Sequence, residues 1–522
     1  MGLKGTWEAR EEEELAGPTQ WQALYKTEDW LAVWIGFLII GIFLMGFTLA
    51  TPKFKWTLGS EFQGMVVENA PVVDKLVQQA AQKDEIALAE QLLALKSAMD
   101  TKNRKAIGSA AGKVEDAAKK AKDAGLKKRA GDLGKEVKSE AGNLADKVFA
   151  WDNIQKALWI GVAYLIISII AMAMMGISIG QFIAGFPFVF VIAWVAQFLA
   201  GNYTILYFGL EYVLWCLFLG LLISNVIGFP EWLMPAVRTE FYIKSGLVIL
   251  GSRVLFGEII QAGAYGIVQA FLVVAVIWYF CFWLCRKLQV DDEFGAMLSS
   301  AVAICGVSAA IATAGAVKGD PKKLSYVTSI VLVCAVPMMV LMPIISKAVG
   351  MPDAVAGAWL GGTLDTSGSV VAAGALISET AMKVGVIVKM SQNVLIGVAA
   401  FILSVVWAFK GAAVGEKPSL MEIWYRFPKF VLGFIVASLL FSFMLSPKTI
   451  NAVKGTLNHL TVWWFALAFT SIGLETRFVD IARMGGGRPA LAFFVAQGIN
   501  ILWTLLLAYL LFGGILFPAF KF

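Results

Sequence analysis

Two apolar stretches of the sequence are interrupted at their centres by residues that are small, hydroxylated and rich in glycine. The first reads AVAICGVSAAIATAGAVKGD (301–320) and the second reads LGGTLDTSGSVVAAGALISE (360–379). Non-helical backbone at membrane depth persists only where protein or a water-filled cavity satisfies its N–H and C=O groups. A half-helix beginning beyond each interruption, near residues 307–310 and 367–370, would direct unpaired N–H groups and a positive dipole end into that cavity. The pattern therefore predicts an anion site.

Polar side chains in and after the interruptions could complete such a site. Hydroxyl and amide donors suit an oxyanion such as sulfate, a sulfonate or a carboxylate. The predicted substrate-binding residues are Gly306, Ser308, Thr363, Thr366, Ser367, Ser369, Gln392 and Asn393. The alternative is that Gly, Ala and Ser only allow helices to pack closely. The occurrence of the pattern twice favours the site.

Asp365 is the most informative single residue of the two stretches. A carboxylate near the bilayer centre costs roughly 2.5 to 3.5 kcal/mol on insertion scales, so a function is expected of it. It could bind a coupling proton or Na⁺; alternatively, it pairs with a lysine or caps the half-helix that starts at Ser367. Lys389 shares one helical face with Gln392 and Asn393 by the three-to-four spacing, and it is the natural partner for Asp365 or for the substrate. We assign Asp365 and Lys389 to the coupling-ion site.

The two stretches also align with each other at a constant offset, in which Ser308 falls on Ser367 and Asp320 on Glu379. Paired Gly-interrupted hydrophobic segments in corresponding positions point to the binding site of a transporter. Both elements could cross the membrane, or both could enter and return. We favour re-entrant elements, because these keep the lysines after the first stretch on the basic side and make the two copies inverted.

The elements that must position these residues are membrane helices. The chain has 522 residues, of which 59% are hydrophobic, and a mean hydropathy of +0.74, which excludes an ordinary soluble protein. We expect an all-α polytopic membrane protein with about eleven spans and two broken or re-entrant elements in inverted repeats. The predicted organisation is an N-terminal segment with the first span (1–50), a soluble, mostly helical insert (51–150) and a transmembrane core (151–522).

Basic residues of the short loops predict the orientation. Arg286, Lys287, Lys410 and Lys417 fall on the side of the N-terminus, and such loops are normally cytoplasmic. Long inserts are exempt from this rule, so we expect the N-terminus inside and residues 51–150 on the opposite side. The net charge of +6 lies in loops and in the insert, which favours contact with anionic lipid and argues against a nucleic-acid partner.

The run from about Ile205 to Ile515 resembles a known family through four motifs: GLVILGSRVLFGEI, AICGVSAAIATAGAV, VVAAGALISE and IGLETRFVDIARMGGGRP. It is similar to the YeiH-type family of bacterial inner-membrane proteins, which are labelled sulfate exporters. The resemblance implies kinship with the cation/proton antiporter and bile-acid symporter group, two discontinuous helices, alternating access and a homodimer. One departure is that TLDTSGSVVAAG stands where the family has SIHEVAQVVAAG, so Asp365 and Thr366 replace a His-Glu pair.

The sequence therefore predicts a secondary active transporter of small inorganic or organic anions, coupled to H⁺ or Na⁺ through Asp365 and surrounded by membrane lipid. Two alternatives remain: a cation/proton antiporter, and a transport-inactive scaffold or sensor that acts through the insert. No nucleophile–base pair or metal-ligand set is recognisable, so we expect neither an enzyme nor a cofactor beyond the coupling ion.

Overall fold

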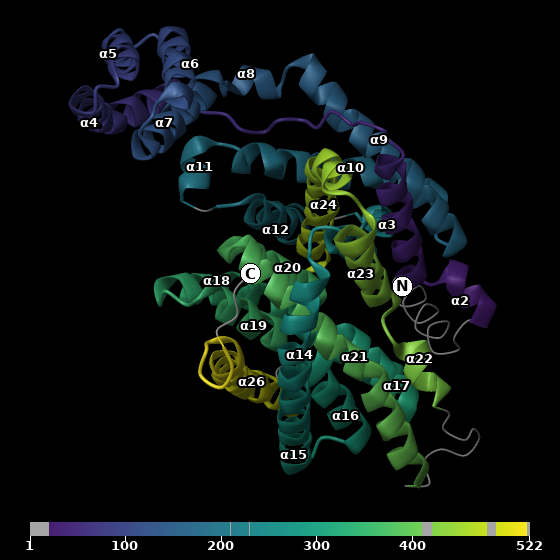
Figure 1. Ribbon diagram of the computed structural model, residues 1–522. Coiled ribbons are helices and arrows are strands. Elements are labelled where there is room, and N and C mark those ends of the chain that lie inside the picture. The colour runs from purple at the N-terminus through teal and green to yellow at the C-terminus, as the bar shows by residue number, and fades with distance from the viewer. Residues whose placement is uncertain (1–19, 209, 229, 410–419, 478–486, 519–522) are drawn as a thin grey trace. The chain divides into compact units, whose positions relative to one another are not determined.

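The computed structural model of the chain describes residues 20–208, 210–228, 230–409, 420–477 and 487–518 (Figure 1). Within these ranges the chain is helical, and its β structure is limited to an isolated bridge between Trp56 and Asn202. The all-α prediction is thus confirmed. Lys410 and Lys417 of the predicted basic loops, and residues 478–486 of the IGLETRFVDIARMGGGRP motif, lie outside the described residues.

Eight helices of the described chain are long and apolar enough to cross a membrane, which confirms a multi-pass membrane protein. They are Trp151–Met174, Ile179–Ala200, Phe256–Lys287, Asp292–Val317, Pro321–Ala348, Glu379–Trp407, Pro447–Glu475 and Arg488–Phe512. Shorter apolar helices are Tyr212–Gly228, Ser367–Ile377 and Lys429–Met444. The remaining short described helices include α2 (Gln20–Lys26), α8 (Ala145–Val148), α11 (Tyr203–Tyr207) and α22 (Met421–Arg426).

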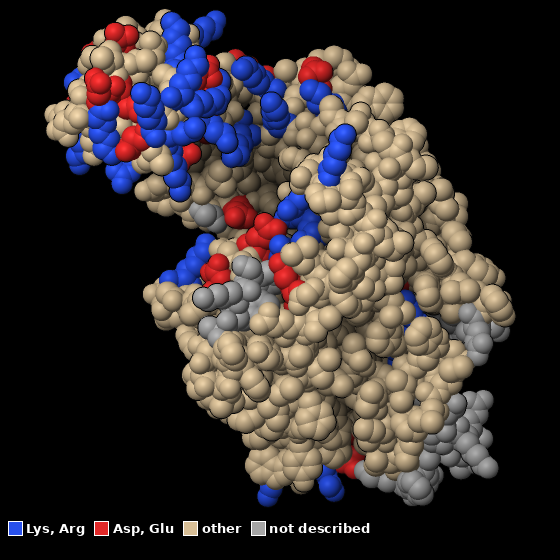
Figure 2. Space-filling model, in the orientation of Figure 1, with Lys and Arg blue, Asp and Glu red and all other residues tan. Residues whose placement is uncertain are grey.

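The described chain divides into two compact units, and the insert unit comprises Ala50–Val162 and Trp194–Trp215. Its helices are α4 (Gly59–Gln82), α5 (Ile86–Asp100), α6 (Arg104–Lys120) and α7 (Ala124–Gly142). They enclose an apolar core of their own that includes Phe62, Leu92, Ile107, Val114 and Leu133, and charged side chains cover their outside (Figure 2). The lysine-rich helices of the insert, α6 and α7, bury a small or apolar residue at every third or fourth position. This spacing explains why so polar a segment is helical.

The core unit contains a support bundle of four helices, in which α3 (Glu28–Leu44), α23 (Lys429–Leu439) and α24 (Pro447–Glu475) pack around α13 (Thr239–Gly251). Glycine allows the close approach, since a Cβ at Gly251 would lie 2.4 Å from the backbone oxygen of Phe434. Almost all of α13 is buried.

The second part of the core unit is a hairpin group, which packs around α21: α14 (Phe256–Val273), α15 (Tyr279–Lys287), α16 (Asp292–Ser300), α17 (Gly306–Val317), α18 (Pro321–Ala348), α19 (Asp353–Thr363), α20 (Ser367–Ile377), α21 (Glu379–Phe409) and α26 (Arg488–Phe512) (Figure 1). A π-helical segment, η4 (Ala301–Cys305), joins α16 to α17. The two interrupted stretches of the sequence form α16–η4–α17 and α19–α20.

The first of these, hairpin 1 (α16–η4–α17), enters and returns on the same side. Asp291, just before α16, forms an ion pair of 2.5 Å with Lys323 at the start of α18. A Cβ at Gly319, just after α17, would lie 3.0 Å from the sulfur of Met297 in α16. The two ends of the element therefore lie together, and the element is re-entrant.

The second, hairpin 2 (α19–α20), is also re-entrant, because both of its arms flank the first turns of α21. A Cβ at Gly357 in α19 would lie 2.5 Å from the backbone oxygen of Ala381, and a Cβ at Gly374 in α20 would lie 2.5 Å from the Cα of Met382. The unbroken α18 separates the hairpins; its 28 residues span about 42 Å. The open ends of the two hairpins thus lie at opposite ends of α18, the arrangement expected of inverted, re-entrant elements.

Candidate functional site

The tips of the two hairpins touch each other. The break of hairpin 1 lies at Cys305–Gly306, and that of hairpin 2 lies at residues 364–366. A Cβ at Gly306 would lie 3.2 Å from the backbone oxygen of Asp365 and 2.4 Å from Cγ1 of Val331 in α18. Gly306 is therefore a contact residue between the tips, where a larger side chain does not fit.

The helices that leave the tips, α17 and α20, begin at Gly306 and Ser367, close to the positions expected from the sequence. The first N–H groups of a helix lack intrahelical acceptors and carry partial positive charge. Thr366 caps α20, because its Oγ1 accepts from the Ser369 N–H at 3.1 Å and lies 2.7 Å from the Ser369 hydroxyl. The corresponding residue of α17, Cys305, makes no side-chain cap.

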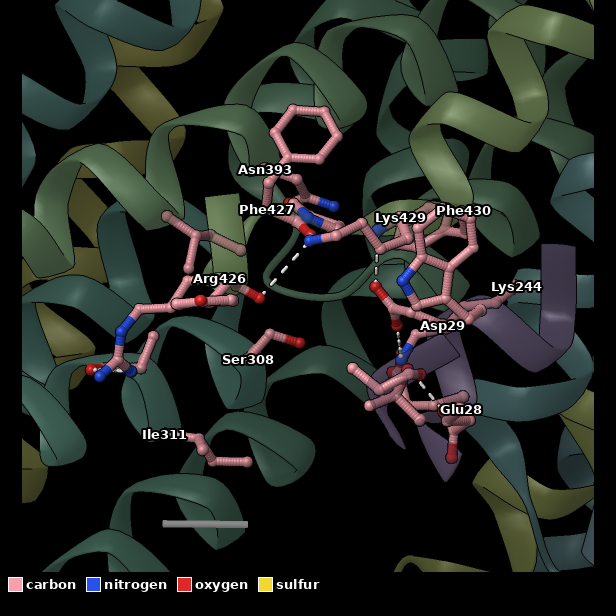
Figure 3. Close-up of a pocket in the computed structure, with 18 of the residues that line it drawn as sticks. Glu28, Asp29, Lys244, Ser308, Ile311, Asn393, Arg426, Phe427, Lys429 and Phe430 are labelled. Atoms are coloured by element: carbon pink, nitrogen blue, oxygen red, sulfur yellow. Dashed lines mark hydrogen bonds and ion pairs between the residues drawn. The ribbon is translucent and has the colours of Figure 1, made fainter. Parts of the chain in front are cut away.

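A cavity of about 640 Å³ lies between the hairpin group and the support bundle (Figure 3). From the hairpin group, Ser308, Ser367 and Asn393 line it, three of the residues that the sequence analysis selected. Asn393 donates to the Ser367 hydroxyl at 3.2 Å, and its own amide oxygen accepts no hydrogen bond from the described residues. Two helix N-termini and their polar side chains thus border one space.

Charged side chains form the opposite wall of the cavity, and the sequence analysis missed them. Lys244 lies 2.9 Å from Asp29, 3.0 Å from Glu28 and 3.6 Å from Glu240. These residues come from α3 and α13, which are far apart in the sequence. Charges within or beside apolar helices, as in TEFYIKSGLVIL, were the available signal.

Two further cations line the cavity beside hairpin 1. The Arg426 guanidinium donates to the backbone oxygen of Ala312 at 2.8 Å. The Lys429 ammonium donates to backbone oxygens at the end of α22, including that of Phe427 at 2.6 Å. The cavity wall therefore carries basic and acidic groups in comparable number (Figure 3).

Lys389 and Gln392 point to the backbone of hairpin 1 and do not line the cavity. Lys389 donates to the oxygen of Ile304 at 2.6 Å and to the Gln392 amide oxygen at 3.0 Å. Gln392 in turn donates to the oxygen of Ala303 at 2.7 Å. The expected Lys389–Asp365 pair is absent from the ion pairs of the described residues, because carbonyls at the end of η4 hold the ammonium.

Asp365, in the tip of hairpin 2, has only 1% of its surface exposed. Neither of its carboxyl oxygens has a hydrogen-bond partner within the described chain, and the Thr363 hydroxyl lacks one as well. Gln497 and Asn500 of α26, which the sequence analysis did not select, donate to the Thr363 backbone oxygen at 2.9 Å and 3.4 Å. A buried carboxylate without donors is costly, so Asp365 stands out among the buried polar groups of the two hairpins.

Comparison with known proteins gives the family context. A family model described as "Conserved hypothetical protein 698" matches residues 184–492. The "UPF0324 membrane protein RB9488" of Rhodopirellula baltica is 41% identical over 376 residues, which are 70% of this chain and 68% of the relative. A "UPF0324 membrane protein" of Nitratidesulfovibrio vulgaris is 40% identical over 67% of this chain and 62% of its own length. The "UPF0324 membrane protein TauZ" of Paracoccus denitrificans is 27% identical over 61% of this chain and 95% of its own length. No solved structure matches.

Proposed function

Because the chain belongs to the conserved hypothetical protein 698 family of UPF0324 membrane proteins, the YeiH-type family, we propose that it is a secondary active transporter of small anions. The substrate is a sulfate-like oxyanion, a sulfonate or a carboxylate. Transport is coupled to H⁺ or Na⁺ through Asp365 and proceeds by alternating access. This is a non-enzymatic function.

The contact between the tips of two inverted re-entrant hairpins is the observation that carries the proposal. Gly306 meets Asp365, and the helices that start there, α17 and α20, place Ser308 and Ser367 on one cavity. Broken helices whose N-termini face a shared space within the membrane are typical of substrate sites in transporters with inverted repeats. An oxyanion would accept hydrogen bonds from those N–H groups and from the hydroxyls.

The two ends of α13 support alternating access. Glu240 and Lys244, near its start, line the cavity. Arg253, just beyond its last residue, forms an ion pair of 2.6 Å with Glu379, where hairpin 2 joins α21. The 13 residues of α13 span about 20 Å. The hairpin group and the support bundle are thus separated by the cavity near Glu240. They are joined by the ion pair at Arg253, as in a transporter that is open to one side of the membrane.

The location follows the same proposal. We infer a bacterial inner membrane, with the N-terminus in the cytoplasm and residues 51–150 on the opposite side, because the short loops on the N-terminal side carry Arg286 and Lys287. A homodimer in contact with anionic lipid completes the proposed assembly.

The test is radiolabelled sulfate uptake into proteoliposomes with imposed pH and Na⁺ gradients, for the wild type and for Asp365→Asn. We expect gradient-driven flux in the wild type and uncoupled or lost flux in the variant, because the amide cannot take the place of an ionisable carboxylate. Sulfonates and carboxylates are then tested as competitors. A chain lacking residues 67–146 should retain flux, since its insert unit supplies none of the cavity residues.

Two results would overturn the proposal in favour of its rivals. Na⁺-dependent proton movement without flux of any tested anion would indicate a cation/proton antiporter that uses the same Asp365. A phenotype that depends on residues 67–146, with no flux at all, would indicate a scaffold or sensor.

A further inference from the structure

The break in hairpin 2 presents two helix ends of opposite polarity. The N-terminus of α20 begins at Ser367, and the C-terminus of α19 ends at Thr363. The last carbonyls of a helix lack intrahelical donors and carry partial negative charge. The N-terminus of α20 therefore attracts an anion, and the C-terminus of α19 attracts a cation.

The equivalent helix end in hairpin 1 already has a cation. The carbonyls at the end of η4 each accept from a buried side chain: Val302 from Asn500 at 3.2 Å, Ala303 from Gln392 at 2.7 Å and Ile304 from the Lys389 ammonium at 2.6 Å. Lys389 is 2% exposed. In hairpin 1 a cation of the chain itself thus donates to the carbonyls of the helix end.

The helix end in hairpin 2 receives no hydrogen bond from a cation of the described residues, although the Lys389 ammonium interacts with Asp365 electrostatically over a longer distance. Its donors to the Thr363 carbonyl are the neutral amides of Gln497 and Asn500. Thr363, Asp365 two residues later and Gln497, which donates to the Thr363 carbonyl, carry four side-chain oxygens without a hydrogen-bond partner in the described chain: both carboxyl oxygens of Asp365, the Thr363 hydroxyl and the Gln497 amide oxygen. The three residues are each at most 2% exposed, so bulk water does not satisfy these oxygens.

We propose that these four oxygens form a Na⁺ site at the C-terminus of α19, with Thr363, Asp365 and Gln497 as side-chain ligands. The inference rests on the proposed function, because it identifies the ion that couples through Asp365, and it adds Gln497 and Thr363 to the site. Na⁺ occupies in hairpin 2 the position that the Lys389 ammonium occupies in hairpin 1.

The number of unpartnered oxygens favours Na⁺ over a proton. A proton on Asp365 binds one carboxyl oxygen, whereas a hard cation takes several oxygen ligands at once. The Thr363 hydroxyl is itself a donor, yet it makes no hydrogen bond to Asp365 or Gln497. If Asp365 were protonated, the Thr363 hydroxyl would remain without a partner. A bound Na⁺ would instead be coordinated by the oxygen of that hydroxyl.

The experiment measures Na⁺ binding without transport. Thermal unfolding of the purified full-length protein in detergent is followed at fixed pH and ionic strength, with NaCl replacing choline chloride or KCl. The variants are Asp365→Asn and Gln497→Met. The matched control is Gln269→Met, because Gln269 is also fully buried, also has an unpartnered amide oxygen and also donates to a hairpin 2 carbonyl, that of Ala358 at 2.8 Å.

We expect Na⁺ to raise the Tm of the wild type by a saturable amount, as a ligand of the folded state does. The rise should vanish in Asp365→Asn. The half-saturating Na⁺ concentration should increase about tenfold or more in Gln497→Met and stay unchanged in Gln269→Met. The comparison of the two glutamine variants decides the question even if Asp365→Asn does not fold.

Three results would overturn the site: no rise with Na⁺ in the wild type, an equal rise with KCl, or equal weakening by Gln497→Met and Gln269→Met. Failure of the site and failure of the proposed function are distinguishable. Sulfate flux driven by a pH gradient, with no effect of Na⁺ on Tm, removes the Na⁺ site and leaves the transporter. A Na⁺-dependent Tm without flux of any anion retains the site and removes the anion transporter.

Discussion

The two hairpins occupy equivalent positions in the repeat, yet their tips are built differently. In hairpin 1 the break is Cys305–Gly306, without a polar side chain of its own, and Lys389 and Gln392 satisfy its carbonyls. In hairpin 2 the break carries Asp365, whose carboxylate has no partner within the described chain. In one copy a lysine of the chain donates to the carbonyls of the break, whereas the other copy, in our proposal, takes up a Na⁺ ion. The difference suggests that hairpin 1 is a fixed wall and that hairpin 2 is the exchanging element.

The largest effect should come from separating the tips. In Gly306→Ala, the new Cβ would lie 2.4 Å from Val331 and 3.2 Å from the Asp365 backbone oxygen, so the tips must move apart. Misplacement by about 1 Å can cost about 100-fold in rate, and we expect sulfate flux to fall by that order. Gly263→Ala is the control, because its Cβ would meet only Ile387, at an ordinary 3.9 Å. Equal flux in both variants would show that the contact between the tips is dispensable.

Removing the built-in cation tests whether hairpin 1 is complete without external ions. Lys389→Met leaves the Ile304 oxygen and the Gln392 amide oxygen buried without this donor, at a cost of about 1 to 3 kcal/mol each. We expect a clearly lower Tm and little flux. Lys383→Met, on the same helix, affects a partly exposed pair with Glu379 and should cost less than about 1 kcal/mol. A Tm loss that is no larger for Lys389→Met would contradict the proposed role.

The helix cap at the tip of hairpin 2 should affect substrate binding more modestly. Thr366→Ala removes the acceptor for the Ser369 N–H, which costs about 1 kcal/mol. Because the cap fixes the N-terminus that faces the cavity, we expect KM for the anion to rise about fivefold. Ser378→Ala removes a similar cap, the acceptor for the Ala381 N–H at 3.0 Å, at the other end of the hairpin. Its KM should not change, and a matching rise there would assign the effect to general destabilisation.

Local patterns predicted the hairpins, whereas the sequence analysis did not identify the partners of their side chains. Small and hydroxylated residues in apolar stretches indicated two breaks, and their repeated spacing indicated two related elements. These features could be read from the sequence because each depends only on residues that are close together in the chain. Lys389 was expected to pair with Asp365 or with the substrate, and its ammonium donates to the Ile304 oxygen. That contact depends on how α21 packs against η4. Gln497 and Asn500 were missed because α26 follows hairpin 2 by more than a hundred residues. The cluster around Lys244 was missed for the same reason, since α3 and α13 meet only in the folded protein.

The smallest effect should come from breaking the contact between an arginine and hairpin 2. Each hairpin has such a contact with one arginine. Arg426 holds hairpin 1 through a neutral carbonyl, that of Ala312, whereas Arg253 holds the end of hairpin 2 through the Glu379 carboxylate, whose side chain is 53% exposed. Ion pairs at such exposed positions contribute about 0 to 1 kcal/mol and are screened by salt. Glu379→Gln should therefore change the turnover rate by no more than about fivefold, and it should remove the part of the flux that varies with ionic strength. Turnover is measured in proteoliposomes at low and high concentrations of an impermeant salt.

Asp291→Asn is the control for that measurement, because the Asp291–Lys323 pair is also partly exposed but joins the start of hairpin 1 to the start of α18, both within the hairpin group. If alternating access separates the hairpin group from the support bundle, only the Arg253–Glu379 pair must break in each cycle, so only Glu379→Gln should lose the salt dependence. Loss in both variants would indicate a general effect of surface charge. If neither variant loses the salt dependence of turnover, the hairpin group and the support bundle do not separate at Arg253–Glu379. The difference between a fixed hairpin 1 and an exchanging hairpin 2 would then have to arise from a motion confined to the tips.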